Sequence, residues 1–222
     1  MKKFKKIREE HKKALLKKLY KNAPSLPVAF GRHSVPEKKV NESVESESKV
    51  KHPDHIAAIH DYTTASHNIN QPLHNGEEIP DFKKKTKRHL DHMFDDKSTH
   101  VGKDHTVYTG LNAAGHEAFK NLKLHHDGMH RVKQKAYTST TKDPEIAKNF
   151  TTKDEHGKKH ILKIHVPAHH PSVDISHHSA WKAEDEKEVL LHRGTLLKIH
   201  PATTEKDGYV YHHATVEGHD PD

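Results

Sequence analysis

The order of two hydrophobic periodicities constrains the fold of this chain more than any other feature of its sequence. Over residues 52–76, with Gly76 as the stop, and over residues 81–96, apolar residues recur at the spacing of helices. The pattern then changes to short β-branched runs, which indicate strands at 105–110, 134–140, 158–166, 187–192, 195–200 and 208–216. Two further helices are predicted between these strands, at 112–124 and, after the capping residue Asp143, at 144–150. Helices followed by mostly antiparallel strands predict an α+β fold and argue against a doubly wound parallel sheet.

The N-terminal fifty residues differ in character from the rest of the chain. Residues 3–21 place Phe4, Ile7 and Leu15 at helical intervals and fill the other face with lysine and arginine, which predicts a basic amphipathic helix. Such a helix either packs on the domain or docks on a membrane surface or a partner. Residues 23–50 are rich in proline and charge and have little to bury. We therefore expect a helical arm at 1–22, a flexible polar linker at 23–50 and one domain at 51–222.

Composition limits the kinds of site that the chain can build. It contains no cysteine, which excludes disulfides and thiolate metal sites. Its 27 histidines include adjacent pairs, but neighbours in a strand point to opposite faces and none has the spacing of a zinc motif, so we expect no metal. The formal net charge of +7 favours non-specific association with nucleic acid. No apolar run approaches the roughly 18 residues that cross a bilayer, so no membrane partner is expected.

Two motifs carry polar groups that strand geometry brings together. The stretch "EKEVLLHRGT" places Glu186 and Glu188 two residues apart where a strand begins, so both are expected on one face, about 6–7 Å apart at the backbone. The stretch "YTSTTKDPEIAKNF" carries Ser139, Thr140 and Thr141. Taken singly, each motif is typical of an ordinary solvated strand. Their order and spacing along the chain are what favour a functional site.

Together with "VYTGL" at 107–111 and the helical "AIHDYTTASHNINQPLHNG", these motifs resemble the ADP-ribosyltransferases of the Arg–Ser–Glu type. That family includes the clostridial binary toxins and transferases encoded by large tailed bacteriophages. The similarity covers about residues 53–216. It implies an ADP-ribosyltransferase fold in which N-terminal helices pack on a core of two mostly antiparallel sheets, with NAD as the substrate.

The resemblance also implies a role for individual residues. Glu188 falls at the position of the catalytic glutamate, Glu186 at that of the acceptor-facing glutamate, and Ser139 at that of the serine that holds Glu188. Thr109 stands where the family has an arginine that grips NAD phosphate, and His74 stands where arginine is common. A carboxylate suits the reaction, because cleaving nicotinamide from NAD leaves positive charge at the ribose carbon. Contacts to NAD are expected at Tyr108, Thr109, Gly110, Ser139, Thr140 and Thr141.

These assignments predict an NAD-dependent mono-ADP-ribosyltransferase that modifies arginine on host bacterial proteins, in the host cytoplasm. The start "MKKFKKIREEHKK" is similar to short head-targeting peptides of large tailed phages, which implies a phage-encoded protein that can also travel in the virion. Thr109 leaves two alternatives open. Either Lys103, Arg131 or Lys133 supplies the missing charge, or the fold persists without turnover as a virion or DNA-associated protein. A third alternative is transfer to an acceptor other than arginine, including nucleic acid.

Overall fold

The computed structural model describes residues 2–26, 48–181 and 186–221 of the 222-residue chain, so most of the predicted linker lies outside the described residues. Helices come first along the chain: α1 (Lys2–Tyr20), α2 (Pro53–Thr64), α3 (His67–Asn75), α4 (Asp81–Asp95) and the short η1 (Lys97–Thr99). The strands are β1 (His105–Gly110), β2 (His130–Lys133), β3 (Thr138–Thr141), β4 (Lys159–Val166), β5 (Ser172–Asp174), β6 (Glu188–Leu191), β7 (Thr195–Lys206) and β8 (Tyr209–His219). Between strands lie α5 (Ala113–Lys120), α6 (Pro144–Lys148) and η2 (Ser176–His178). The predicted α+β class is confirmed.

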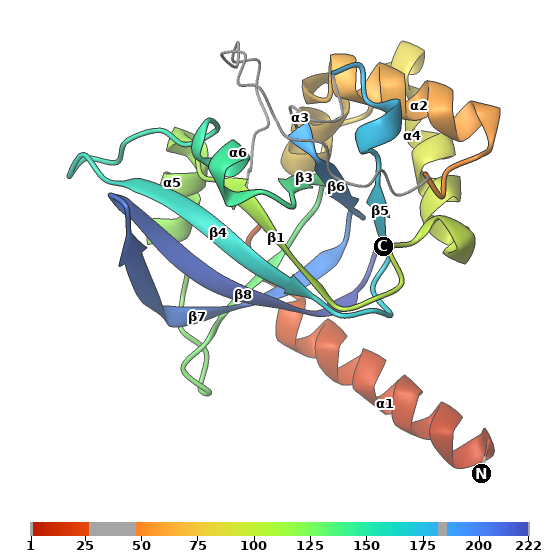
Figure 1. Cartoon of the computed structure of the whole chain (residues 1–222). Coiled ribbons are helices and arrows are strands. Elements are labelled where there is room, and N and C mark those ends of the chain that lie inside the picture. The colour runs from red at the N-terminus through yellow and green to blue at the C-terminus, as the bar shows by residue number, and fades with distance from the viewer. Residues whose placement is uncertain (1, 27–47, 182–185, 222) are drawn as a thin grey trace.

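In the described part of the chain the strands form one eight-stranded sheet, in the order β2-β7-β8-β4-β1-β3-β6-β5 (Figure 1). Its neighbouring strands are antiparallel, as predicted, except for the parallel pair β4–β8. The prediction of two separate sheets was wrong in that respect. A single register pair, Tyr108 with Thr141, joins β1 to β3 and connects a five-stranded half to the three-stranded half β3-β6-β5.

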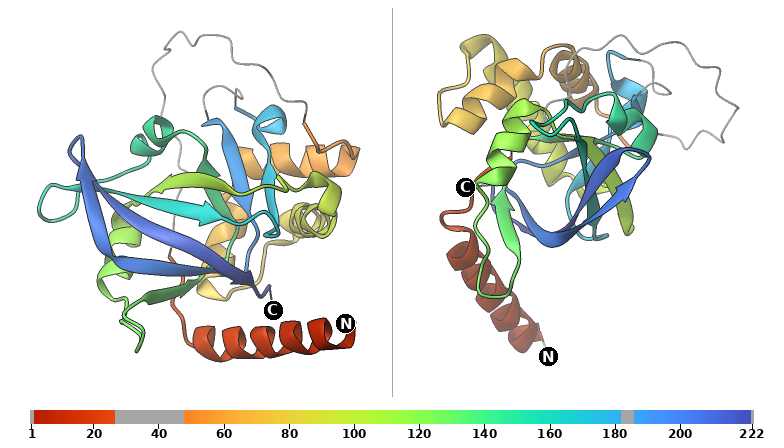
Figure 2. Two further views of the ribbon diagram at one scale, coloured as in Figure 1. Left: turned by 60° about the horizontal axis from the view of Figure 1, so that its bottom comes forward. Right: turned by 90° about the vertical axis from the view of Figure 1, so that its left-hand side faces the viewer.

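The three-stranded half of the sheet separates two hydrophobic clusters. On β6, Val189 and Leu191 enter a cluster built from the strands and α5, which we call the sheet core. Leu190 points the other way and joins Ile59 and Met93 of the helices in a second cluster, the helical core. Alternating strand side chains point to opposite faces, so each face of β6 is buried against its own layer. In Figures 1 and 2, α2, α3 and α4 gather together over the β3-β6-β5 end of the sheet.

Local sequence signals set the limits of the N-terminal helices. Pro53 occupies the first turn of α2, and His52 caps it by accepting a hydrogen bond from the backbone two residues on. The helical stretch predicted at 52–76 is divided into α2 and α3, because the backbone leaves helical geometry at Ala65. Gly76 ends α3 in the left-handed conformation, as the sequence predicts.

The last two strands are longer than their apolar pattern indicated. A two-residue turn at Asp207 and Gly208, both with positive φ, connects them and confirms the turn predicted at "EKDG". Register shifts in the β7–β8 pair, one of them between Ile199 and Thr203, let the two strands continue past the predicted end at 200. The outer half of β7 is exposed and mostly polar, and an apolar periodicity cannot detect such a segment.

Residues 20–26 attach α1 to the domain. Tyr20 donates a hydrogen bond to Glu217 of β8 at 3.0 Å, and the backbone N–H of Lys133 donates to the carbonyl of Pro24 at 2.9 Å. Leu26 is fully buried in the sheet core, and Val50, beyond the undescribed residues 27–47, is buried in the helical core. Figures 1 and 2 show α1 extending from this attachment outside the body of the molecule. The boundaries expected for arm and linker remain predictions.

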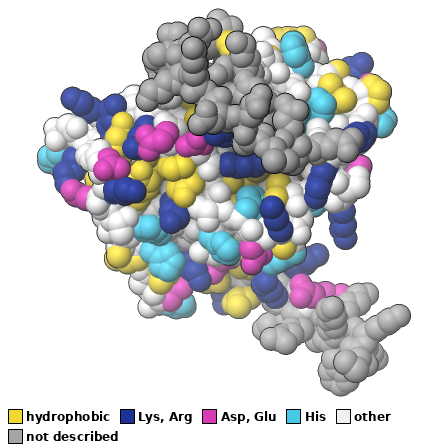
Figure 3. Space-filling view, viewed as in Figure 1, with side chains coloured by type: hydrophobic (Ala, Val, Ile, Leu, Met, Phe, Trp, Pro, Cys, Tyr) yellow, Lys and Arg dark blue, Asp and Glu magenta, His cyan; other side chains and the backbone are white. Residues whose placement is uncertain are grey.

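The surface shows how the positive charge is distributed. On the face drawn in Figure 3, lysine and arginine side chains are interspersed with acidic and histidine side chains. Among the described residues, no helix is both long enough and apolar enough to cross a membrane.

Candidate active site

The pairing of β3 with β6 places the predicted catalytic residues on one side of the sheet. Thr141 lies opposite Glu188, and Ser139 lies opposite Leu190. Directly opposed residues and those two apart on a strand share a face, so Ser139, Thr141 and Glu188 all point toward the helical core. Thr140 points away, and its hydroxyl donates to the carbonyl of Val189. The structure therefore brings Ser139 and Glu188 together, whereas the hydroxyl of Thr140 is used in a hydrogen bond within the sheet.

Glu188 is a buried carboxyl group at the first position of β6. Only 3% of the residue is exposed, and burial raises its pKa from 4.5 to about 8. The nearby Glu186 raises that pKa further, while a hydrogen bond donated by Ser139 lowers it. Glu188 is thus protonated at neutral pH in the free protein. Mild alkali ionises this carboxyl, and a positively charged substrate bound beside it would lower its pKa. The ionised form is the one that can stabilise a cation.

Ser139 is in turn held by the helices. The hydroxyl oxygens of Tyr62 on α2 and Ser139 lie 3.2 Å apart, and Nδ2 of Asn70 on α3 donates to Tyr62 at 2.9 Å. Neither Tyr62 nor Asn70 was predicted from the sequence to belong to the site. The available signal was the choice of tyrosine at a fully buried helix position, because a buried phenol needs a polar partner.

Glu186 does not lie on the strand, which corrects the prediction that both glutamates share one strand face. β6 begins at Glu188, and Lys187 before it has φ +44°, a left-handed conformation unusual for a residue with a side chain. The Lys187 carbonyl accepts from Lys142 N–H at 3.2 Å, and its ammonium group pairs with Asp143 at 3.0 Å. Glu186 is still close enough to Glu188 to raise its pKa. A turn, and not strand periodicity, brings the two carboxylates together.

Gly110 and Tyr108 lie at the end of β1 near α6. A Cβ atom on Gly110 would come within 2.6 Å of the carbonyl oxygen of Ala147, so only glycine allows α6 to approach. The close approach to Gly110 is thus made by α6, and the contact of Gly110 with NAD stays a prediction. Tyr108 is half-buried and packs on a small cluster that contains Ala147, Ile161 and Tyr211.

Thr109 occupies the position where an arginine was expected, and it is fully buried. It lies opposite Leu162 and, by strand alternation, points the same way as Val107 into the sheet core. Its hydroxyl has no hydrogen-bond partner within the described residues. Of the cations considered as substitutes, Arg131 lies on β2 at the opposite edge of the sheet and pairs with Asp127 at 2.7 Å. Thr109 therefore presents no surface to a ligand in this structure.

His74 lies on α3, one helical turn beyond Asn70 and thus on the same helix face. Its Nδ1 and the Ser25 hydroxyl are 3.1 Å apart, and burial together with the charge of Lys135 lowers the pKa of His74. The side chain is therefore neutral near pH 7. It offers polar contacts in place of the fixed charge that an arginine would bring.

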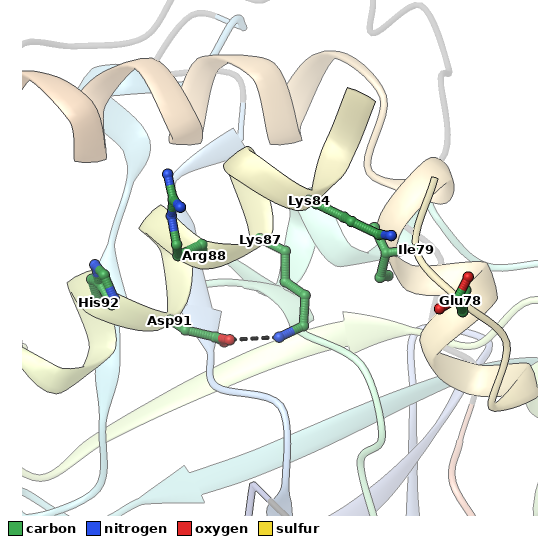
Figure 4. A pocket seen from close by; sticks show the side chains of 7 residues that line it. All are labelled: Glu78, Ile79, Lys84, Lys87, Arg88, Asp91 and His92. Carbon is green, nitrogen blue, oxygen red and sulfur yellow. Dashed lines mark hydrogen bonds and ion pairs between the residues drawn. The ribbon is translucent and has the colours of Figure 1, made fainter. Parts of the chain in front are cut away.

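A hollow of about 380 Å³ lies along α4, and none of its lining residues belongs to β3 or β6 (Figure 4). At its base Asp91 accepts hydrogen bonds from Lys87, Arg193 and Tyr137. Arg193 follows β6 in the "EKEVLLHRGT" motif, so this part of the motif ties β6 to α4. The residues lining the hollow are Glu78, Ile79, Lys84, Lys87, Arg88, Asp91 and His92.

The arrangement of the described side chains also bears on metal binding. Within the part of the chain that the structure describes, no group of three or more His, Asp or Glu side chains is arranged to hold a metal ion. Some histidines contact one another, as in the distance of 2.8 Å between His160 Nδ1 and His212 Nε2.

A profile of the ADP-ribosyltransferase exoenzyme family matches residues 13–218. The chain belongs to this family. The family predicted from the motifs is therefore confirmed, and the substrate of ADP-ribosyltransferases is NAD. The match begins inside α1, which agrees with the packing of residues 20–26 on the domain. No curated protein sequence matches the chain.

Solved ADP-ribosyltransferases share the fold. The Clostridium limosum C3 exoenzyme is 19% identical, with a TM-score of 0.58 over 77% of this chain and 88% of that one. The S. aureus C3stau2, solved with NAD, is 19% identical, with a TM-score of 0.56 over 76% and 89%. Exoenzyme S from Pseudomonas aeruginosa, solved with human 14-3-3 protein beta and carba-NAD, is 16% identical, with a TM-score of 0.57 over 74% of each chain. At these identities the similarity concerns the fold alone.

Proposed function

We propose that this ADP-ribosyltransferase modifies arginine side chains of proteins, with Glu188 as the catalytic carboxylate and Glu186 as the group that faces the acceptor. The observation that supports the proposal most strongly is the buried Glu188 carboxyl, which receives a hydrogen bond from Ser139 and lies close to the second carboxylate of Glu186. Few buried carboxyl groups lack a cationic partner unless the site uses them.

The chemistry follows from the charges involved. The bond between nicotinamide and its ribose breaks, and nicotinamide leaves as a neutral base with the bonding electrons. The ionised Glu188 stabilises the positive charge that develops at the ribose carbon, most strongly because water is excluded from its surroundings. A guanidinium nitrogen of the acceptor then bonds to that carbon and releases a proton. Glu186 orients the guanidinium and accepts the proton, since carboxylates pair well with guanidinium groups.

Separate replacement of the two glutamates tests this division of roles. With labelled NAD and a small guanidinium compound as acceptor, Glu188→Gln is expected to abolish both nicotinamide release and transfer. Glu186→Gln is expected to retain hydrolysis of NAD and to lose transfer to the guanidinium. The matched control is Glu205→Gln. Glu205 is an exposed glutamate on the β7–β8 hairpin and pairs with Lys158, so this variant should retain both hydrolysis and transfer. Transfer that survives Glu186→Gln at the wild-type rate would exclude the proposed role of Glu186.

A second candidate function is supported by Thr109, whose buried hydroxyl replaces the expected cationic contact to NAD. A charged hydrogen bond is worth roughly 1.5–3 kcal/mol, enough to weaken NAD binding tens to hundreds of fold. On this account the fold persists without turnover, as a basic virion or DNA-associated protein. Calorimetry with NAD separates the two: heat of binding at millimolar NAD supports the enzyme, and its absence supports the second candidate.

We further propose that the acceptor is a host bacterial protein and that the chain is phage-encoded, acts in the host cytoplasm and can travel in the virion. The support is the resemblance of the first thirteen residues to head-targeting peptides and the net charge of +7. Labelling of a bacterial lysate with NAD, followed by identification of the labelled protein and of the modified residue, tests the acceptor. Release of the label by nuclease would instead indicate a nucleic-acid acceptor.

A further inference from the structure

A row of three hydrogen bonds leads from Asn70 on α3 to the Glu188 carboxyl through two buried hydroxyl groups. Asn70 donates to the Tyr62 hydroxyl at 2.9 Å, that hydroxyl lies 3.2 Å from the Ser139 hydroxyl, and Ser139 donates to Glu188. Tyr62 is fully buried, and Ser139 and Glu188 are 4% and 3% exposed. Water is therefore a poor substitute for any member of this row.

The chemistry of the donors gives the row a direction. The amide nitrogen of Asn70 can only donate, so the Tyr62 oxygen accepts and its own hydrogen is left for Ser139. When the Ser139 oxygen accepts a hydrogen bond from Tyr62, the hydrogen of the Ser139 hydroxyl is directed to the Glu188 carboxylate. Hydrogen bonds in such a series polarise one another in a low-dielectric interior.

We propose that Tyr62 is a positioning residue of the transfer reaction: supported by Asn70, its hydroxyl fixes Ser139 as a hydrogen-bond donor to Glu188 and thereby favours the ionised carboxylate. This inference rests on the proposed function, in which the ionised Glu188 faces the ribose. Tyr62 acts through Ser139 and does not itself touch the reacting atoms.

The neighbouring Tyr137 provides an internal comparison. Its ring lies 5.8 Å from that of Tyr62 in an edge-on contact, and it too is buried. Its hydroxyl donates to Asp91 and to the carbonyl of Lys87, in the network that ties β6 to α4. The two phenols are thus alike in burial and packing but serve different carboxylates, only one of which is Glu188.

The test compares Tyr62→Phe with Tyr137→Phe, since phenylalanine keeps the ring in both. Nicotinamide release is measured as kcat and KM between about pH 6 and pH 10. In the wild type, kcat/KM is expected to rise as Glu188 ionises, around the pKa of about 8. Tyr62→Phe is expected to move this rise upward by about half a pH unit or more and to lower kcat with little change in KM. Tyr137→Phe is expected to lower Tm and to leave the position of the rise unchanged.

A second readout needs neither NAD nor turnover. Infrared titration of the free protein follows protonation of the Glu188 carboxyl, which is identified by its disappearance in Glu188→Gln. Tyr62→Phe is expected to shift this titration upward, and Tyr137→Phe is not. An inactive wild type would contradict the proposed function while leaving this test intact. Wild-type titration of Glu188 in Tyr62→Phe would overturn the inference even in an active enzyme.

Asn70→Asp tests the direction of the row. An aspartate accepts a hydrogen bond from Tyr62, so the phenol turns away from Ser139 and the Glu188 titration is expected to move upward. The same substitution in Tyr62→Phe measures the effect of the added charge alone. A larger shift with the phenol present supports the direction from Asn70 to Glu188, and equal shifts in the two backgrounds would overturn it.

Discussion

Replacing Glu188 by glutamine is expected to stabilise the protein at alkaline pH and to abolish its reaction at the same time. The pKa of Glu188 is 4.5 as an unperturbed group and about 8 in the folded protein, mainly because the carboxyl is buried. Below pH 4.5 the carboxyl is protonated in both states and costs nothing. As pH rises from 4.5 to about 8, the unfolded chain releases this proton and the folded chain keeps it, so the folded state loses relative stability.

The magnitude follows from the distance between these two pKa values. At about 1.4 kcal/mol for each pH unit, the loss above pH 8 amounts to about 5 kcal/mol, a large part of the stability of a typical domain. Glutamine fills nearly the same volume and does not ionise, so the variant avoids this cost. Part of the loss has already occurred at pH 5. The stability of Glu188→Gln relative to wild type should therefore grow by about 4 kcal/mol between pH 5 and pH 9.

Urea unfolding at the two pH values measures this difference directly. The comparison of wild type with Glu188→Gln removes the contributions of the titrating groups that do not interact with Glu188. Glu205→Gln, at an exposed glutamate, is measured beside it as the control for replacing a carboxylate that is not buried. A constant difference for Glu188→Gln would refute the claim that burial holds this carboxyl protonated.

Three further outcomes are expected. Leu26→Ala should lower the free energy of unfolding by about 2–5 kcal/mol in urea titration, because Leu26 is fully buried, whereas Leu15→Ala, at a residue 51% exposed, should change it by about 0.5 kcal/mol or less. Thr109→Val removes a buried hydroxyl that has no partner among the described residues, so it should raise the free energy of unfolding by about 1 kcal/mol and raise Tm slightly. Thr109→Arg should lower Tm strongly, because it buries a charge. The contribution of His212 to stability should fall as pH drops from 6.5 towards 4, because burial lowers its pKa to about 4 and the unfolded chain binds the proton first; in urea unfolding, wild type should therefore lose stability relative to His212→Gln over this range.

Much of the fold could be predicted because its signals are local. The strand predicted at 105–110 coincides with β1, and the capping residue Asp143 does begin the short helix α6. The number of sheets could not be predicted in this way, since it depends on one register pair between Tyr108 and Thr141. Leu26 was likewise assigned to a linker, because a single apolar residue among prolines has no periodic pattern to reveal its burial.

The site was predictable to the extent that strands and a family resemblance define it. Ser139 and Glu188 meet as expected, because β3 and β6 pair in the register that places them diagonally. The left-handed Lys187 could not be foreseen, since glycine is the residue that usually indicates this conformation. Tyr62 escaped notice for a different reason: its hydroxyl partner lies 77 positions away, and no local pattern connects the two.

The rate of nicotinamide release from NAD, measured side by side for wild type and Glu188→Gln at alkaline pH, shows whether the reaction depends on this carboxylate. We expect measurable release by wild type and a loss of about 100-fold or more in the variant, because the developing positive charge loses its carboxylate. Equal rates in the two proteins would contradict the assignment of Glu188 as the catalytic residue.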